Sequence, residues 1–589
     1  MSERRILLIF AVALAVLPVI PGLPPFWITL LNNIGLASLV TIGLVLLTGV
    51  GGMTSFGQAT FCGFGAYTTA VLTTAYGLSP WISLPIALLV TGIAAVVLGL
   101  ITVRLSGHYL PLGTIAWGIS LYFLFGRIEM LGRHDGVSDI PPLSIGAWSL
   151  IDPKAMYWVI WTCVLLAGIG TSNLLSSRIG RAIRALRAGG AAAESFGVDR
   201  ISVKLIVFVY AALLAGLSGW LYAHLQRSVN PTPFSLGAGI EYLLMATLGG
   251  AGYVWGALIG ASLVTLLKDV LQRILPAVFG NDVQLEPIVF GILLVATLHF
   301  AREGLWSRLV ALFPTAAPEA PSLDVPPLPR RALDKIETTS LLAIDSASKR
   351  FGGIVAVNDV SFSIRPQEII ALIGPNGAGK STLFNLITGV LNLTAGNVTF
   401  ADKSIGNHAP RDIARRGIAR TFQHVKLISD MSVLDNVALG AHLRGRSGVI
   451  ASVLHLNRAE EARLLAEASR QIARVGLSEQ MHKPAGSLPL GQQRIVEIAR
   501  ALCLDPRLLL LDEPAAGLRQ FEKRSLADLL RQLRDEGMTL LLVEHDMSFV
   551  MKLADQIVVL DLGTKIAHDT PAAIKTNPAV LAAYLGTEP

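Results

Sequence analysis

The 98 residues from Ile6 to Val103 include no Asp, Glu, Lys or Arg. A membrane-spanning helix takes about 20 apolar residues, so this stretch is long enough for about four spans. A helix on the surface of a soluble core would show polar residues every third or fourth position, and that pattern is missing here. One large buried core is the alternative, and the chain-wide mean hydropathy of +0.58 disfavours it. The sequence therefore predicts a membrane-spanning N-terminal part.

Apolar segments continue to about residue 300 and predict eight to ten membrane helices. The longest is expected to form a hairpin broken near Gly249 and Gly250. The segments lie near residues 6–23, 28–50, 57–76, 81–103, 109–126, 156–175, 205–226, 237–271 and 287–300.

Basic residues indicate the orientation of this part. Arg178, Arg181, Arg184 and Arg187 crowd one loop between apolar segments, which the positive-inside bias places in the cytoplasm. Two arginines, at positions 4 and 5, suggest a cytoplasmic N-terminus as well. A cleaved signal peptide is the alternative for the first segment, but further membrane segments follow it and favour a retained helix. The net charge of +7 is modest, and we do not interpret it as nucleic-acid binding. The three cysteines are scattered, with no metal-ligand spacing.

Length and composition predict two domains and a linker. A chain of 589 residues exceeds what one core supports. Six prolines fall between Pro314 and Pro329, and such a segment is expected to be an extended, semi-rigid linker rather than a packed element. We therefore expect a membrane domain over 1–313, a linker over 314–340 and a second domain over 341–589. In the last, strand-like and helix-like runs alternate, which is typical of an α/β domain.

The second domain carries a phosphate-binding loop of the form G-x-x-x-x-G-K-[ST]. A strand-like run, Ile369–Ile373, precedes it, and a helix-like run, Leu383–Ile387, follows it, as this motif requires. Its backbone N–H groups would surround phosphate oxygens, Lys380 would reach the β- and γ-phosphates, and Ser381 would ligate Mg²⁺. The nine residues of the loop are Gly374, Pro375, Asn376, Gly377, Ala378, Gly379, Lys380, Ser381 and Thr382. The chain is thus expected to bind a nucleoside triphosphate.

Two later strand-like runs end in polar groups. Leu508–Leu511 leads into Asp512, suited to Mg²⁺, and Glu513, suited to a hydrolytic water. Leu540–Val543 leads into Glu544, His545 and Asp546. In α/β folds ligands bind at the carboxyl edge of the sheet, so these groups are expected near the phosphate loop.

With Thr421–Gln423 and Leu488–Arg494 between them, these motifs resemble the ATPase domain of ATP-binding-cassette (ABC) transporters over residues 341–589. The resemblance implies that Phe351 stacks on adenine, with an ordinary core Phe as the alternative. It implies that Gln423 touches Mg²⁺ and the attacking water, that Asp512 supports Mg²⁺, that Glu513 is the general base and that His545 senses the γ-phosphate. Its signature segment would complete the ATP site of a partner subunit, and comprises Leu488, Pro489, Leu490, Gly491 and Gln492.

Two positions depart from the pattern of that family. Pro489 and Leu490 replace the Ser and the first Gly of the usual Leu-Ser-Gly-Gly-Gln, and Arg519 stands where an Asp or Asn is usual. Proline offers neither an N–H nor a hydroxyl to a γ-phosphate. These departures concern the site completed in the partner, not the site on this chain's own phosphate loop.

The membrane part resembles the permeases of branched-chain amino acid importers. The resemblance lies in Ser55–Tyr67, Arg104–Tyr109, Gly136–Pro142 and Ser177–Ala182. Ala192–Gly197, inside the arginine-rich loop, is similar to the short coupling helix that docks on the ATPase in such importers. The glycines of the first segment are also expected to allow close helix packing. In the ATPase part, the motifs around Arg420–Val425, Asp512–Leu518 and Ala582–Gly586 resemble the ATPase of the same importers, whose signature often lacks its Ser.

The predicted fold is thus a polytopic α-helical membrane domain of eight to ten helices, followed by an α/β P-loop ABC ATPase domain. The resemblance implies ATP-driven uptake of branched-chain or related hydrophobic amino acids across the bacterial inner membrane, with the ATPase in the cytoplasm and ATP and Mg²⁺ as cofactors. It implies three partners: a second permease, a second ATPase and an extracytoplasmic substrate-binding protein. Importers of urea, amides or aromatic acids remain as alternatives. A fused exporter would need charged cytoplasmic extensions, for which the uncharged run leaves no room, and an ATP-gated channel or sensor is disfavoured by Glu513 and His545.

Overall fold

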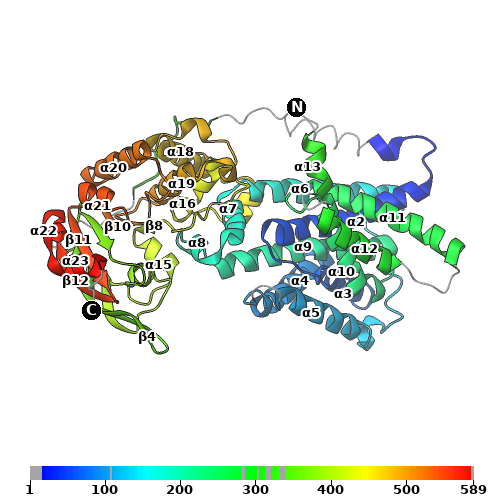
Figure 1. The fold of residues 1–589 in the computed structure, drawn as a ribbon. Helices are drawn as coiled ribbons and strands as arrows, with labels where there is room; N and C mark the ends of the chain where they lie inside the picture. The colour runs from blue at the N-terminus through cyan, green and yellow to red at the C-terminus, as the bar shows by residue number, and fades with distance from the viewer. Residues whose placement is uncertain are drawn as a thin grey trace. The chain divides into compact units, whose positions relative to one another are not determined.

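The computed structural model describes residues 16–105, 109–146, 148–279, 286–300, 304–311, 320–330 and 340–585. By their internal contacts these form two units (Figure 1). The first holds 1–176, 201–317 and 449–456, and the second holds 177–200, 318–448 and 457–589. Residues 177–200 thus lie in the first half of the sequence but pack with the second unit. Residues 449–456 lie in the second half but pack with the first unit. Some of the residues used in the sequence analysis lie outside the described residues. They are the arginines at positions 4 and 5, most of the first apolar segment, the middle of Arg104–Tyr109, and Gly586.

The first unit is helical. Every predicted apolar segment within the described residues contains a helix, and the longest one is a hairpin of two helices with a break after Gly249, as expected. The helices are α2 (Pro25–Leu44, continued by a π-helical turn Val45–Val50), α3 (Gln58–Thr74), α4 (Pro80–Thr102), α5 (Tyr109–Phe125), α6 (Pro153–Leu175), α9 (Arg200–Gln226), α10 (Leu236–Gly249), α11 (Gly256–Phe279), α12 (Glu286–Phe300) and α13 (Gly304–Ala311). Short 3-10 turns at Leu17–Val19, Glu129–Leu131 and Thr232–Phe234, and the two-stranded β1 (Ser144–Ile145) and β2 (Trp148–Ser149), connect them.

Among the described residues, four helices are long and apolar enough to cross a membrane by length and composition. They are Pro25–Val50, Pro80–Thr102, Pro153–Leu175 and Arg200–Gln226, and two shorter apolar helices, Tyr109–Phe125 and Leu236–Gly249, accompany them. On α4 most of the surface is apolar and exposed, as expected for a helix that faces lipid rather than water.

Glycines let helices of this unit approach closely. A Cβ on Gly65 of α3 would lie 2.1 Å from the carbonyl oxygen of Gly216 on α9. A Cβ on Gly219 would lie 2.0 Å from that of Cys62. Any side chain at these positions would force the two backbones apart, so the small residues set the α3–α9 distance.

The second unit is built on a six-stranded sheet in the order β12-β11-β5-β10-β9-β8. From β11 to β8 neighbouring strands are parallel, with Leu540 of β10 paired to Ile369 of β5 and to Leu509 of β9. A four-stranded antiparallel sheet, β4-β3-β6-β7, accompanies it (Figure 1). The strands are β3 (Leu342–Phe351), β4 (Ile354–Ile364), β5 (Ile369–Ile373), β6 (Ala395–Phe400), β7 (Lys403–Ser404), β8 (Ile418–Arg420), β9 (Leu508–Asp512), β10 (Thr539–Val543), β11 (Gln556–Asp561) and β12 (Thr564–Asp569).

The central strands are apolar along their whole length because both faces of the sheet are covered. Ile369, Ala371 and Ile373 of β5 join one buried cluster, and Ile370 and Leu372 join the other. The helices of this unit are α7 (Arg178–Ala185), α8 (Gly190–Glu194), α14 (Lys380–Ile387), α15 (Pro410–Arg415), α16 (Val433–Gly440), α18 (Arg458–Arg474), α19 (Leu490–Cys503), α20 (Gln520–Asp535), α21 (Met547–Leu553), α22 (Pro571–Thr576) and α23 (Pro578–Leu585).

The described part of the proline-rich segment, residues 320–330, packs on the ATPase unit, contrary to the expectation of a linker that packs against nothing. Leu328 is only 6% exposed and joins a buried cluster with residues of α16, α18 and α19. Arg444 donates hydrogen bonds to the carbonyl groups of Leu328 and Pro329, and Arg470 donates to that of Val325. A proline-rich backbone makes no internal hydrogen bonds to its carbonyl groups. These two arginines supply the missing donors.

The short helix α17 (Val449–Val453) belongs to the second half of the sequence but packs on α6 of the first unit. The side chain of Asn173 donates to the carbonyl of Val453 at 3.1 Å. Gly170 of α6 leaves room for Val453, because a Cβ there would lie 2.9 Å from its side chain.

Candidate functional site

Strands β5, β10 and β9 are adjacent and parallel, so their carboxyl ends meet at one edge of the sheet. The phosphate loop follows β5, Asp512 ends β9 with Glu513 directly after it, and His545 lies two residues beyond β10. Residues predicted from separate motifs therefore lie at the same edge.

The phosphate loop has the backbone that its glycines allow. Gly377 and Gly379 have φ angles of 84° and 92°, in the left-handed region that side chains rarely adopt. At Gly379 a Cβ would also lie 2.4 Å from the carbonyl oxygen of Ala356 on β4. Helix α14 begins directly after this glycine, so its N-terminal N–H groups open onto the loop.

Lys380 is buried, and its ammonium group donates to the carbonyl oxygens of Gly374 and Pro375, both at 2.8 Å. Burial lowers the pKa of Lys380, while the negative charges of Glu513 and Asp512 act in the opposite direction. The same carboxylates that face this lysine therefore favour its charged form, which is the form that neutralises a phosphate.

Two of the predicted catalytic side chains converge on the carboxylate of the third. Gln423 donates to Oε1 of Glu513 at 3.0 Å, and Nε2 of His545 lies 3.2 Å from the same oxygen. Glu513 itself has a φ of 48°, which is uncommon for a residue with a side chain. Arg494, from the first turns of α19, donates to the backbone carbonyl of Glu513 at 2.6 Å and to that of Gln423 at 3.3 Å, so it ties these two residues to one another.

Asp512 has the features of an Mg²⁺ ligand. Its Oδ1 is buried and accepts no hydrogen bond from any described residue. Burial raises the pKa of Asp512, and the nearby Arg420 opposes that rise. A buried carboxylate oxygen without a donor is costly, and a hard cation would satisfy it. The residues present thus fit Mg²⁺, with Ser381 and Gln423 predicted as the other ligands.

Glu544 makes contacts at this edge that the sequence did not predict. It is buried, and its carboxylate accepts hydrogen bonds from the N–H groups of Ala515, at 2.7 Å, and His545, at 3.0 Å. Glu544 therefore fixes the loops that follow β9 and β10 against each other. The sequence signal for these contacts was the position of Glu544 directly after a buried strand. This signal is not specific, because carboxylates at such positions have many different roles.

The other predicted binding residues are Phe351 and the signature segment Leu488–Gln492. Phe351, at the end of β3, is 45% exposed, with the ammonium of Lys349 5.1 Å from its ring centre. This exposure does not fit the alternative of a core Phe. In the signature segment, Pro489 is the N-cap of α19 and Leu490 is exposed. Within the described part of the chain, no hydrogen bond or ion pair joins Leu488–Gln492 to the phosphate loop.

Comparison with known proteins covers both halves of the chain. The profile of a permease component of branched-chain amino acid transport systems matches residues 26–298, that of ABC transporters matches 357–516, and that of branched-chain amino acid ATP-binding cassette transporters matches 564–589. The branched-chain amino acid transport ATP-binding protein LivG of Salmonella typhimurium is 42% identical over 249 residues, which are 42% of this chain and 98% of that protein. The chain belongs to the branched-chain amino acid ABC transporter family.

A second relative carries the same kind of name. BraF of Pseudomonas aeruginosa, also named as a high-affinity branched-chain amino acid transport ATP-binding protein, is 39% identical over 249 residues, 42% of this chain and 98% of its own length. A solved ATP-binding cassette in its ADP conformation is 32% identical, with a TM-score of 0.38, and is covered completely by 42% of this chain. As an ABC transporter that joins a permease to its ATPase, this chain is membrane-associated, binds ATP and couples ATP hydrolysis to transport. Transporters of this kind work with partner subunits and a substrate-binding protein.

In this transporter the segment 177–200, which belongs to the permease by sequence, is held by the ATPase unit. Phe196 and Val198 are fully buried there, and Gly197, with a φ of 82°, leaves no space for a Cβ, which would lie 2.2 Å from Cγ of Leu443. The ring of Phe196 lies below the guanidinium of Arg500 on α19.

Charged groups hold both ends of this ABC transporter segment. Arg181 is buried and pairs with Glu461 at 2.7 Å, and the backbone N–H of Arg178 donates to the other oxygen of that carboxylate. Two guanidinium nitrogens of Arg178 donate to backbone carbonyls of the ATPase, those of His442 and Ser447, each at 2.8 Å. At the far end Asp199 pairs with Arg411. Removal of either partner of the ion pair Arg181–Glu461 would leave a buried charge without its counter-charge, which is destabilising.

Proposed function

We propose that this chain is one half of an importer that takes up branched-chain or related hydrophobic amino acids, with permease and ATPase fused. One observation carries the proposal: the two halves match the same transport system independently. The permease profile covers 26–298, and LivG aligns with the ATPase half over 98% of its length. The relatives that carry a substrate in their name, LivG and BraF, are named for high-affinity branched-chain amino acid transport.

The catalytic proposal assigns a task to each group at the sheet edge. Lys380 and the loop N–H groups neutralise and orient the phosphates. Glu513 accepts the proton of the attacking water, and Gln423 and His545, which both reach its Oε1, hold that carboxylate in place. Ser381, Gln423 and Asp512 would hold Mg²⁺, which would supply positive charge to the β- and γ-phosphates. Phe351 provides the exposed aromatic surface for adenine.

The signature segment Leu488–Gln492 serves a second ATP site, completed on the partner ATPase. Exposure of Leu490 and its place at the start of α19 support this role, because the segment is accessible to another subunit. We infer that the chain works with a second permease, a second ATPase and an extracytoplasmic binding protein in the bacterial inner membrane, with the ATPase unit in the cytoplasm.

The segment Ala192–Gly197 transmits the ATPase movement to the permease. Leu443 and Arg500 hold this segment. Arg500 lies on α19, the helix that begins at the signature. Arg494 of the same helix donates to the backbone carbonyl of Glu513. A change at the ATP site therefore has a short, packed route to this segment.

Reconstitution tests the proposed substrate. The chain is assembled in proteoliposomes with its partner permease, partner ATPase and binding protein, and ATP is enclosed on the ATPase side. We expect accumulation of radiolabelled leucine above the outside concentration, and its loss when the chain carries Glu513→Gln. Accumulation of urea, an amide or an aromatic acid in place of leucine would overturn the proposed substrate assignment. Leucine movement only down its concentration gradient would point to an ATP-gated channel.

A further inference from the structure

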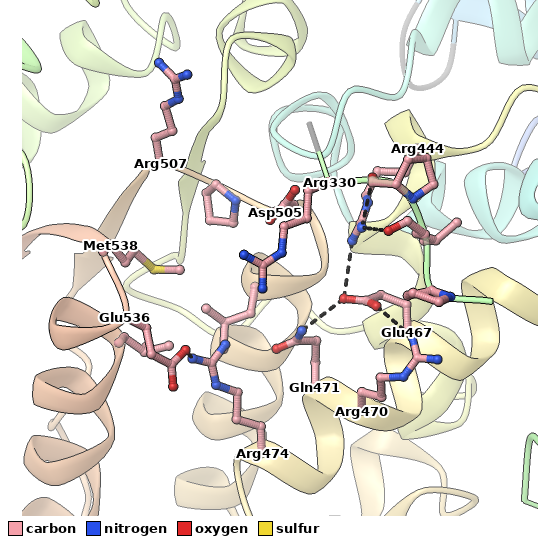
Figure 2. Close-up of a pocket in the computed structure, with 17 residues that line it drawn as sticks. Arg330, Arg444, Glu467, Arg470, Gln471, Arg474, Asp505, Arg507, Glu536 and Met538 are labelled. Atoms are coloured by element: carbon pink, nitrogen blue, oxygen red, sulfur yellow. Dashed lines mark hydrogen bonds and ion pairs between the residues drawn. The ribbon is translucent and has the colours of Figure 1, made fainter. Parts of the chain in front are cut away.

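The proline-rich segment and the ATPase unit enclose a cavity of about 730 Å³, shown in Figure 2. Pro327–Arg330 form one wall, and the second half of α18 forms another. The residues that precede β9 and the end of α20 complete it. Small-molecule sites have volumes of about 300–1,000 Å³, so the cavity has the size of a metabolite site. None of its lining residues belongs to the ATP site described above.

Five arginines and three carboxylates line this cavity, so its positive charge exceeds its negative charge. Arg444 and Arg470 share the single carboxylate of Glu467, at 3.3 and 3.2 Å. Arg474 pairs with Glu536. Within the described ranges the side chain of Arg330 makes no hydrogen bond or ion pair, and it is directed toward the middle of the cavity (Figure 2).

The charge of Arg330 acts on Arg474 across the cavity. The pKa of Arg474 is lowered first by burial and then by the positive charge of Arg330. Like charges held together in a partly buried place disfavour each other, and an anion placed between the two guanidinium groups would remove that cost. Guanidinium groups are also the side chains best shaped to bind phosphate.

Gln471 adds a separate requirement for a hydrogen-bond donor. Its Nε2 donates to Oε1 of Glu467 at 3.0 Å. A carboxylate only accepts, so the amide orientation is determined, and Oε1 of Gln471 faces elsewhere. That oxygen is buried and receives no hydrogen bond from a described residue. A ligand hydroxyl group would satisfy it.

We propose that this cavity binds a small phosphorylated metabolite that carries hydroxyl groups, of the size of a nucleoside monophosphate. The phosphate lies between Arg330 and Arg474, a hydroxyl donates to Gln471, and the body of the ligand rests on the apolar wall of Leu502, Leu533 and Met538. Because Arg330 belongs to the proline-rich segment, the bound ligand also holds that segment on the ATPase. The site exists only where permease and ATPase are joined by such a segment.

Calorimetric titration of the full chain in lipid nanodiscs tests the site. The chain carries Lys380→Ala to weaken binding at the phosphate loop, and the probes are adenosine monophosphate and adenosine. We expect the monophosphate to bind at least ten times more tightly than adenosine. Arg330→Glu should weaken the monophosphate at least tenfold, while the matched control Arg524→Glu, on the exposed side of α20, should leave it unchanged.

Arg330 is exposed, so its replacement is not expected to unfold the ATPase, and equal thermal unfolding of both variants checks this. Gln471→Leu should weaken the monophosphate but leave inorganic phosphate unaffected, because only the former carries ribose hydroxyl groups that can reach Gln471 while its phosphate lies between Arg330 and Arg474. The proposal is overturned if adenosine monophosphate does not bind, if it binds no better than adenosine, or if Arg330→Glu and Arg524→Glu bind it equally.

Discussion

The guanidinium carbon of Arg500 lies 4.5 Å from the centre of the Phe196 ring, and both side chains are 1% exposed. Arg500 also pairs with Glu497 at 2.9 Å, one turn earlier on α19. A cation–π contact that is shielded from water contributes about 2 kcal/mol. The helix that reaches the catalytic Glu513 through Arg494 thus also holds a segment of the permease sequence.

Gly197→Leu, combined with Glu194→Trp, should separate ATP hydrolysis from transport. A side chain at position 197 would collide with Leu443 and would have to adopt a φ of 82°. We expect leucine uptake in the reconstituted complex to fall at least tenfold while ATPase activity persists. Ala191→Leu, at an exposed position of α8 directly before this segment, is the control and should retain uptake. Undiminished uptake by the double variant, at equal expression, would exclude Ala192–Gly197 as the coupling segment.

Lys380→Ala should abolish transport and weaken ATP binding. The substitution removes the positive charge that faces Glu513 and Asp512 and that would neutralise the β- and γ-phosphates. Nucleotide affinity of the purified chain, measured with a fluorescent ATP analogue, checks this. Wild-type affinity in this variant would contradict the role given to the lysine.

Glu513→Gln should retain ATP binding and lose hydrolysis. The amide keeps the shape of the side chain and a hydrogen bond to Gln423, but it cannot accept a proton from water. The complex is expected to remain in its ATP-bound state, as measured by nucleotide retention after gel filtration. Hydrolysis at the wild-type rate, with a catalytically inactive partner ATPase, would show that another group is the base.

The apolar helices, the phosphate loop and the sheet edge could be predicted because each leaves a local trace in the sequence. Hydrophobic length identifies α4, and a strand followed by a polar residue identifies Asp512 and His545. Contacts between distant side chains leave no such trace. Nothing in the spacing of Gln423 and Glu513 gives their 3.0 Å contact, and nothing near Arg444 indicates that it binds the carbonyls of Leu328 and Pro329.

Proline composition was also a poor guide to packing. Prolines predict an extended backbone, and residues 320–330 do lack helix and strand. Extended backbone still packs where a buried partner such as Arg444 meets its carbonyl groups. Composition therefore predicted the conformation of this segment but not its surroundings.

His442 should make the ATPase unit sensitive to acid. Burial, followed by the positive charges of Arg178, Arg181 and Arg415, lowers the pKa of His442 to about 3. The unfolded chain takes up a proton below its ordinary pKa of about 6.5, but the folded chain does not, so stability present above pH 6.5 is lost as the pH falls toward 3. At pH 5 this is about 2 kcal/mol. Thermal unfolding at pH 7.5 and pH 5 should show a smaller loss for His442→Asn than for the wild type, and equal losses would contradict the assignment.

The two ATP sites of the assembled transporter should be unequal. Pro489, at the start of α19, has no N–H and no hydroxyl to give to a γ-phosphate on the partner. Arg519, the other residue that departs from the family pattern, is exposed. The loss of one hydrogen bond to a charged group is worth about 1.5–3 kcal/mol, or roughly 10- to 150-fold in rate if it acts only in the transition state. The site on this chain's phosphate loop is therefore expected to be the faster one.

Separate mutation of the catalytic Glu in each ATPase of the complex measures this inequality. Near-total loss of hydrolysis for Glu513→Gln, with a small effect of the partner's substitution, is the expected pattern. Equal residual activities would mean that the N–H of Gly491 and the start of α19 suffice without the missing groups.

Residues 177–200 pack with the ATPase unit, and residues 449–456 pack with the membrane helices. Each half of the sequence therefore contributes one segment that packs with the other half. A single protease cut between the two halves would leave both pieces in place, so the nicked protein should migrate as one particle in gel filtration and separate only in denaturant. The ATPase produced without residues 177–200 would instead present an open, partly apolar socket around Leu443 and Arg500, and a peptide of that sequence should restore its solubility. Under this expectation the peptide bond between the halves is not required to keep them together.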